Sequence, residues 1–269
     1  MNYEEQKNGE FAPNEKISNA ILIFLLLVRL ADEYLPAWIF GTTTPDWYRN
    51  WYAGVAYILT ATIVWLNRHR LVALNIDRPF IAALILGGVL HAFYLKYGVG
   101  IFVGITVVLI FWAHQSNQLV FKNPVPYPKG TGLLILLTIL LALAPVLLFR
   151  LTLKTSLDFD TFSTTFLGIL ITDLALIVFE EVLFRGALWA YVRSFGLSEQ
   201  AAFYAQAILF WISHHRFLLL HNPYSFWVSL PIQAILFGLM TWRSKSITPS
   251  TISHFLFNFI TQLLVAIFK

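Results

Sequence analysis

The chain has 269 residues, of which 58% are hydrophobic and 12% are charged, and its formal net charge is +4. An ordinary soluble domain carries about 25% charged residues, so this chain lacks the polar surface that a soluble protein of its size needs. The composition also excludes a disordered or collagen-like chain. The 18 basic residues are scattered without a cluster, which argues against a nucleic-acid partner and favours contact with anionic membrane lipid.

Residues 1–16 form a polar, acidic tail that does not have the pattern of a cleavable signal peptide. Long apolar segments without strand-like alternation follow it, and they predict membrane-spanning helices. These segments lie near residues 17–35, 51–66, 79–95, 98–114, 131–149, 162–193, 200–220, 224–242 and 249–268. We therefore expect an all-α, polytopic transmembrane bundle of about nine helices (eight to nine).

The Pro-rich segment 123–130 is the expected domain boundary. It separates an N-terminal transmembrane extension of about four helices, residues 17–122, from a five-helix core, residues 123–269. Short loops and a polar N-terminus favour a multi-pass protein of a bacterial inner membrane. The chain has no cysteine, which excludes disulfides, thiolate catalysis and cysteine-based metal sites.

Two adjacent carboxylates stand out inside the apolar segment 162–193. Glu180 and Glu181 lie in lipid-depth sequence, where each ionisable group costs at least ~2.5–3.5 kcal/mol and needs a reason. Glu181 and Arg185 are four residues apart, so we expect an ion pair on one helix face. Glu180 points about 100° away and is free for proton transfer. Asp173, two turns earlier, is a possible supporting group, although a core polar contact explains it better.

Two later helices each add hydrogen-bonding groups to apolar sequence. His214 lies one turn after Phe210, and His254 lies one turn before Asn258 on the same helix face. Each of these pairs, taken alone, is also explained by an ordinary hydrogen bond between helices. Together with the glutamates, they place polar groups on three helices that a bundle can bring to one cavity.

In this order and spacing, the three motifs resemble those of the CPBP family of intramembrane glutamic endopeptidases. Residues 180–186 (EEVLFRG) match its EExxxR motif, Phe210 to His214 matches FxxxH, and His254 to Asn258 matches HxxxN. The family includes the Rce1-type CAAX prenyl endopeptidases and bacterial Abi-type proteins. The resemblance covers roughly residues 165–265, so the N-terminal helices lie outside it.

The resemblance implies a peptide hydrolase in which glutamate and histidine activate a water molecule. By motif position, Glu180 is the general base and His214 holds the same water. His254 and Asn258 stabilise the oxyanion, while Glu181, Arg185 and Phe210 support the site. The implied substrate is a hydrophobic or lipid-anchored peptide, prenylated or not, and no cofactor is implied.

Two other classes of function stay open at this point. A zinc metalloprotease could use the same His and Glu residues, but HExxH and HxxEH motifs are absent and no metal ligand set is expected. No serine nucleophile motif and no GxGD motif is present. The protein could also be a non-catalytic immunity or binding protein, or a carrier lined by His91, Lys96 and His114, although interfacial or bundle contacts explain these three side chains better.

Overall fold

The computed structural model describes residues 13–31, 39–40, 45–95, 98–121, 126–153, 162–215 and 223–267. Throughout these ranges the regular structure is helical and contains no strand, so the all-α prediction is confirmed. Most of the predicted tail 1–16 lies outside the described residues, as does Lys96.

Nine main helical segments follow one another within this part of the chain, as the apolar segments predicted. The N-terminal ones are α1 (Pro13–Ala31), α3 (Asp46–Leu66), α4 (Arg78–Tyr94) and α5 (Val99–Gln115). The C-terminal ones are α6 (Thr131–Leu153), α7 (Phe162–Glu181) continued by η3 (Val182–Leu188) and α8 (Trp189–Ser194), α9 (Glu199–Ile212), η4 (Ser225–Ser229) continued by α11 (Leu230–Ser244), and α12 (Thr248–Ile267).

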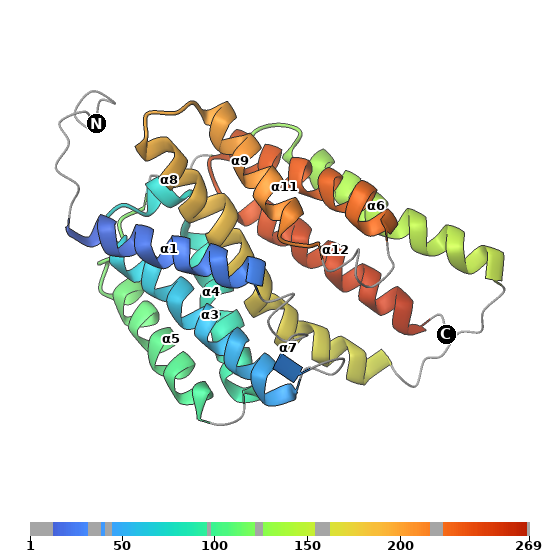
Figure 1. Ribbon diagram of the computed structural model, residues 1–269, viewed down its shortest axis with the longest axis horizontal. Helices are drawn as coiled ribbons and strands as arrows, with labels where there is room; N and C mark the ends of the chain where they lie inside the picture. Colours follow the sequence, from blue (N-terminus) through green and yellow to red (C-terminus); the bar gives the residue numbers. More distant parts are fainter. Residues whose placement is uncertain are drawn as a thin grey trace.

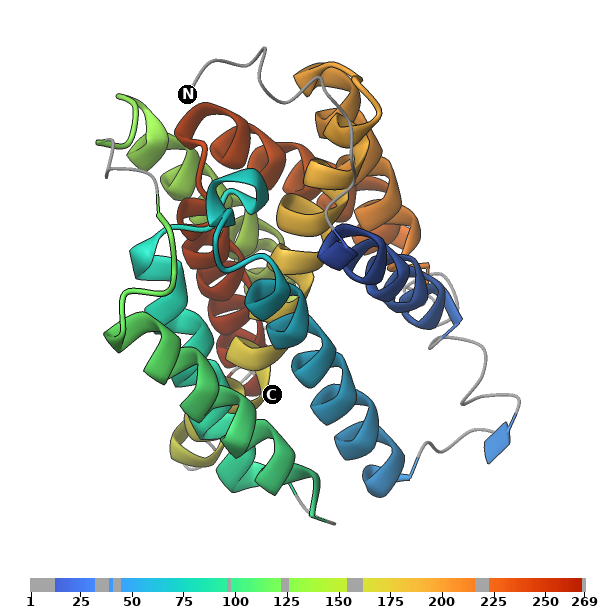
Figure 2. The same ribbon diagram turned by 90° about the vertical axis from the view of Figure 1, so that its left-hand side faces the viewer.

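Helix α7 is the central rod of the bundle. It packs against α3 and α4 on one side and against α12 on the other, and α12 in turn lies along α6 (Figure 1). Helix α1 packs against α3 and η3, and so lies beside the C-terminal extension of α7 (Figure 2). The segment that carries both glutamates is therefore enclosed by helices from both halves of the chain.

Several helices expose large apolar side chains on their outer faces. On α5 these are Ile101, Phe102, Ile105, Val108 and Trp112, each 51–68% exposed. Contiguous faces of this kind mark contact with a membrane or a partner. Within the described residues, the continuous helix Ser225–Ser244 is long and apolar enough to cross a membrane, whereas α4, α5 and Thr131–Ala144 of α6 are apolar but shorter. The polytopic arrangement therefore stays a prediction.

The helix that follows the two glutamates is not regular, which the sequence did not predict. Residues Val182–Leu188 form a π-helix, a form that is rare and occurs frequently at functional sites. The carbonyl of Arg185 accepts a hydrogen bond from Asn75 Nδ2 at 3.0 Å. A Cβ added at Gly186 would meet the carbonyl oxygen of Leu74 at 3.2 Å. The loop that ends the short 3₁₀-helix η2 (Leu71–Leu74) thus docks on the backbone of the π-helical segment.

Asp77 ties this loop to two other connections. Its carboxylate caps α4 by accepting from the Phe80 N–H at 3.2 Å, and it accepts from Ser246 Oγ at 2.6 Å, Tyr127 Oη at 2.9 Å and Thr248 Oγ1. Partial burial and the neighbouring Asp77 carboxylate raise the pKa of Tyr127, so its phenol keeps the proton that it donates. One side chain therefore holds together the start of α4, the start of α12 and the Pro-rich connection.

We expect Asp77→Ala to destabilise the bundle by about 2–3 kcal/mol, because it removes a helix cap and three further charge-assisted hydrogen bonds. Tyr127→Phe removes only one of these bonds and should cost about 1 kcal/mol. Thermal unfolding of the two purified variants in the same detergent measures the difference. Equal melting temperatures for the two variants would show that Asp77 does not organise this junction.

Candidate active site

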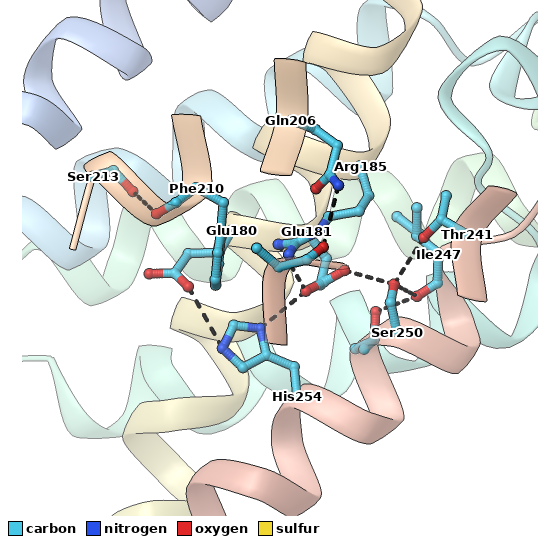
Figure 3. Close-up of polar contacts among 12 residues, drawn as sticks. Glu180, Glu181, Arg185, Gln206, Phe210, Ser213, Thr241, Ile247, Ser250 and His254 are labelled. Atoms are coloured by element: carbon cyan, nitrogen blue, oxygen red, sulfur yellow. Dashed lines mark hydrogen bonds and ion pairs between the residues drawn. The ribbon is translucent and has the colours of Figure 1, made fainter. Parts of the chain in front are cut away.

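Glu181 has a fully buried side chain, as does its partner Arg185. Its Oε1 accepts from Arg185 Nη1 at 3.3 Å and from His254 Nδ1 at 2.9 Å, and its Oε2 accepts from Ser250 Oγ at 2.6 Å (Figure 3). The ion pair predicted from the four-residue spacing is present. Because both oxygens have donors, Glu181 has the contacts that a buried carboxylate needs.

Arg185 lies in an aromatic cage formed by Phe184, Phe210 and Phe237. Its guanidinium carbon is 4.0 Å from the ring centroid of Phe210, 5.3 Å from that of Phe237 and 5.9 Å from that of Phe184. Aromatic faces attract a cation at these distances, and the attraction increases when the cation is desolvated. Phe210 is the phenylalanine of the FxxxH motif. Its ring positions Arg185, and Arg185 in turn pairs with Glu181.

The imidazole of His254 lies between the two carboxylates (Figure 3). Nδ1 faces Glu181 Oε1 at 2.9 Å, and Nε2 faces Glu180 Oε2 at 3.7 Å. The ring of Phe237 stacks on it, with 4.9 Å between centroids. A carboxylate accepts and cannot donate when ionised, so Nδ1 carries a proton and Nε2 is the nitrogen turned toward Glu180.

Glu180 points away from Glu181, as expected for adjacent helical positions, and is slightly exposed, with 12% of its side-chain surface accessible. Its Oε1 lies 3.7 Å from His214 Nε2, while its Oε2 lies 3.7 Å from His254 Nε2. The structure therefore brings side chains from α7, from the end of α9 and from α12 around one carboxylate.

The end of α9 sets the orientation of His214. The helix ends at Ile212, which leaves its last carbonyl groups without intrahelical partners. The Phe210 carbonyl accepts from Ser213 Oγ at 2.8 Å and lies 2.7 Å from His214 Nδ1. Since a carbonyl only accepts, Nδ1 carries the proton, and Nε2 presents its lone pair toward Glu180.

Arg29 also belongs to the site, although the sequence motifs did not predict it. Its Nη2 donates to Glu180 Oε1 at 3.0 Å and lies 3.2 Å from His214 Nε2. Arg29 belongs to α1, in the predicted N-terminal extension, which the motifs do not cover. A signal was present, because an arginine inside the apolar run ILIFLLLVRL needs a partner as much as a glutamate does. Phe237 and Ser250 were missed too, and ordinary core residues carry no such signal.

The remaining candidates lie on α4, α5, α7 and α12. Asn258 is one turn after His254 on α12 and is half-buried, and among the described residues its amide makes no hydrogen bond. Asp173 lies on α7, two turns before Glu180, and accepts a hydrogen bond from Gln262 of α12. His91 is buried in α4, and the ring of His114 lies against Phe121. No group of three or more His, Asp or Glu side chains in the described part of the chain is arranged to hold a metal ion.

Residues 162–260 match the family model described as type II CAAX prenyl endopeptidase Rce1-like. The matched segment contains all three motifs, so the resemblance predicted from them is confirmed there. No curated protein and no solved structure matches the chain. The match begins at α7 and leaves out α6, and the predicted domain boundaries at residues 16, 122 and 269 stay predictions.

We expect Arg185→Leu to cost about 3–5 kcal/mol of stability, because it leaves Glu181 buried without its cation. Glu181→Gln/Arg185→Leu should recover part of this loss, since the glutamine oxygen still accepts from His254 and position 181 no longer carries an unpaired buried charge. Thermal unfolding of the two variants in detergent measures both effects. A double variant that melts lower than Arg185→Leu alone would contradict the importance of the pairing.

Proposed function

We propose that this protein, whose residues 162–260 match the Rce1-like family, is an intramembrane endopeptidase of the CAAX-protease type. Proteins of that family are integral membrane proteases. The observation that carries the proposal is the position of Glu180, whose two oxygens each face the Nε2 atom of a different histidine at 3.7 Å. A carboxylate between two imidazoles is suited to general acid–base chemistry.

In this proposal Glu180 and His214 activate the hydrolytic water. Both groups present lone pairs, and a gap of 3.7 Å between acceptors suits one donor that hydrogen-bonds to both. The water oxygen attacks the peptide carbonyl carbon while its proton passes to Glu180. When the C–N bond breaks, Glu180 returns the proton to the departing amine.

His254 and Asn258 stabilise the oxyanion of the tetrahedral intermediate. The Nδ1–H of His254 is committed to Glu181, so donation from Nε2 requires the imidazolium form, in which both nitrogens donate. Glu181 and Arg185 therefore support catalysis by fixing His254, and Asn258 adds an amide donor from the same face of α12. A preorganised donor in a dry site contributes ~2.7–4 kcal/mol to transition-state stabilisation.

The substrate in this proposal is a hydrophobic or lipid-anchored peptide that reaches the site within a bilayer. The exposed apolar faces of α5 and α6 and the helix Ser225–Ser244 support a membrane location. The proposed location is a bacterial inner membrane, because the segments that connect the helices are short. A non-catalytic binding role would leave the carboxylate and two histidines without a purpose.

Glu180→Gln should lower kcat for peptide cleavage by about 10²–10⁴-fold, since an amide cannot accept the proton of the water. Glutamine keeps the size of the side chain, so the variant should still fold and insert. Glu199→Gln changes the same group outside the site and should retain activity. Cleavage of a fluorogenic prenylated peptide in detergent micelles measures all three proteins, and an active Glu180→Gln enzyme would end this mechanism.

We also expect activity to survive thorough metal chelation. The proposed chemistry uses only protons, water and side chains, and zinc enzymes of the alternative class need a bound ion to activate their water. Treatment with EDTA and with 1,10-phenanthroline, followed by metal analysis of the purified protein, makes the comparison. Loss of activity that added zinc restores would favour the metalloprotease alternative.

A further inference from the structure

Arg29 occupies the position at which the proposed hydrolytic water would have to act. Its Nη2 is 3.0 Å from Glu180 Oε1 and 3.2 Å from His214 Nε2, and these two acceptors are 3.7 Å apart. A water that bridges them needs nearly the same distances to both atoms. The guanidinium and the water therefore exclude each other.

The ion pair between Arg29 and Glu180 is suited to keeping the site closed to water. The side chains of Arg29 and Glu180 are only 13% and 12% exposed, so the pair is poorly screened by solvent. The guanidinium also donates to the lone pair that His214 directs toward the site. Both groups that are proposed to activate water are thus occupied by one side chain.

The arginine reaches the site from outside the motif-bearing segment. Helix α1 packs against α3 and η3 (Figure 2) and ends two residues after Arg29. The family match begins at residue 162, so this contact is not part of the matched segment. The N-terminal half of the chain thereby contributes directly to the site.

We propose that Arg29 is a further active-site residue that acts as a latch, closing the substrate-free enzyme and leaving Glu180 when substrate binds. The inference rests on the proposed function, because only a hydrolytic water at Glu180 makes the position of Nη2 inhibitory. A bound peptide offers carbonyl oxygens that accept from the displaced guanidinium, so the arginine exchanges one acceptor for another. The long side chain can make this exchange while α1 stays in place.

The first test compares cleavage of a fluorogenic prenylated peptide by the native protein, Arg29→Met and Arg29→Lys, each at its own optimal pH. Methionine removes the charge and keeps an unbranched apolar chain, and we expect a severalfold rise in kcat/KM. Lysine keeps a charge with fewer donors, and its kcat/KM should lie between the other two. Arg49→Met removes an exposed arginine of α3 and is the matched control, with native kcat/KM expected. An Arg29→Met enzyme that is slower than the native protein, or equal to it, would overturn the latch.

A second test needs no substrate. Dicyclohexylcarbodiimide modifies protonated carboxyl groups in apolar surroundings, and the latch predicts slow modification of Glu180 in the native protein and fast modification in Arg29→Met. Peptide mass mapping locates the adduct, and Glu180→Gln is the blank. Equal modification rates in the native protein and in Arg29→Met would show that the latch is not closed and would overturn it.

The two tests separate the latch from the proposed function. If the native protein cleaves the peptide and Glu180→Gln does not, while Arg29→Met gains nothing, only the latch is wrong. If Glu180→Gln cleaves as fast as the native protein, the proposed function is wrong and the latch falls with it. If Arg29→Met cleaves the peptide and the native protein does not, and if Arg29→Met/Glu180→Gln has lost this activity, the result supports both the latch and the proposed function.

Discussion

The burial of two adjacent carboxylates is the constraint on which the rest of the structure depends. Glu180 and Glu181 lie next to each other in the interior of a largely apolar bundle, and uncompensated charges there would be prohibitively costly. Two arginines compensate them from different directions. Arg185 reaches Glu181 from the same helix, and Arg29 reaches Glu180 from α1. The four charges cancel, so the site is neutral when both histidines are neutral.

This compensation recruits both halves of the chain. The cage of Phe184, Phe210 and Phe237 surrounds Arg185, while Asn75 binds the carbonyl that the π-helical segment presents. The predicted N-terminal extension therefore supports the motif helix through its backbone and contributes Arg29 to the site. This division differs from the sequence-based expectation, in which the C-terminal core carries the whole site. The motifs mark the residues proposed for catalysis, and the N-terminal helices supply part of their environment.

The sequence predicted the parts of the site that depend on local spacing. The Glu181–Arg185 pair and the contact between Phe210 and His214 follow from four-residue spacing in helices. Contacts between distant segments were beyond such reasoning, because no local period relates Arg29 to Glu180 or Ser250 to Glu181. The fold class and the approximate helix positions followed from apolar segments. The π-helix lies where the loop at Asn75 contacts the backbone of Arg185 and Gly186, and periodicity does not encode such a contact.

The most direct test of the central claim is a double-mutant cycle between Arg29 and Glu180, measured as free energy of unfolding in detergent. Arg29→Met, Glu180→Gln and the combined variant complete the cycle with the native protein. Compensation of the buried carboxylate by this arginine predicts a coupling energy above about 1 kcal/mol, within the range found for residues in direct contact. If the effect of the combined variant equals the sum of the two single effects within about 0.5 kcal/mol, the account is contradicted.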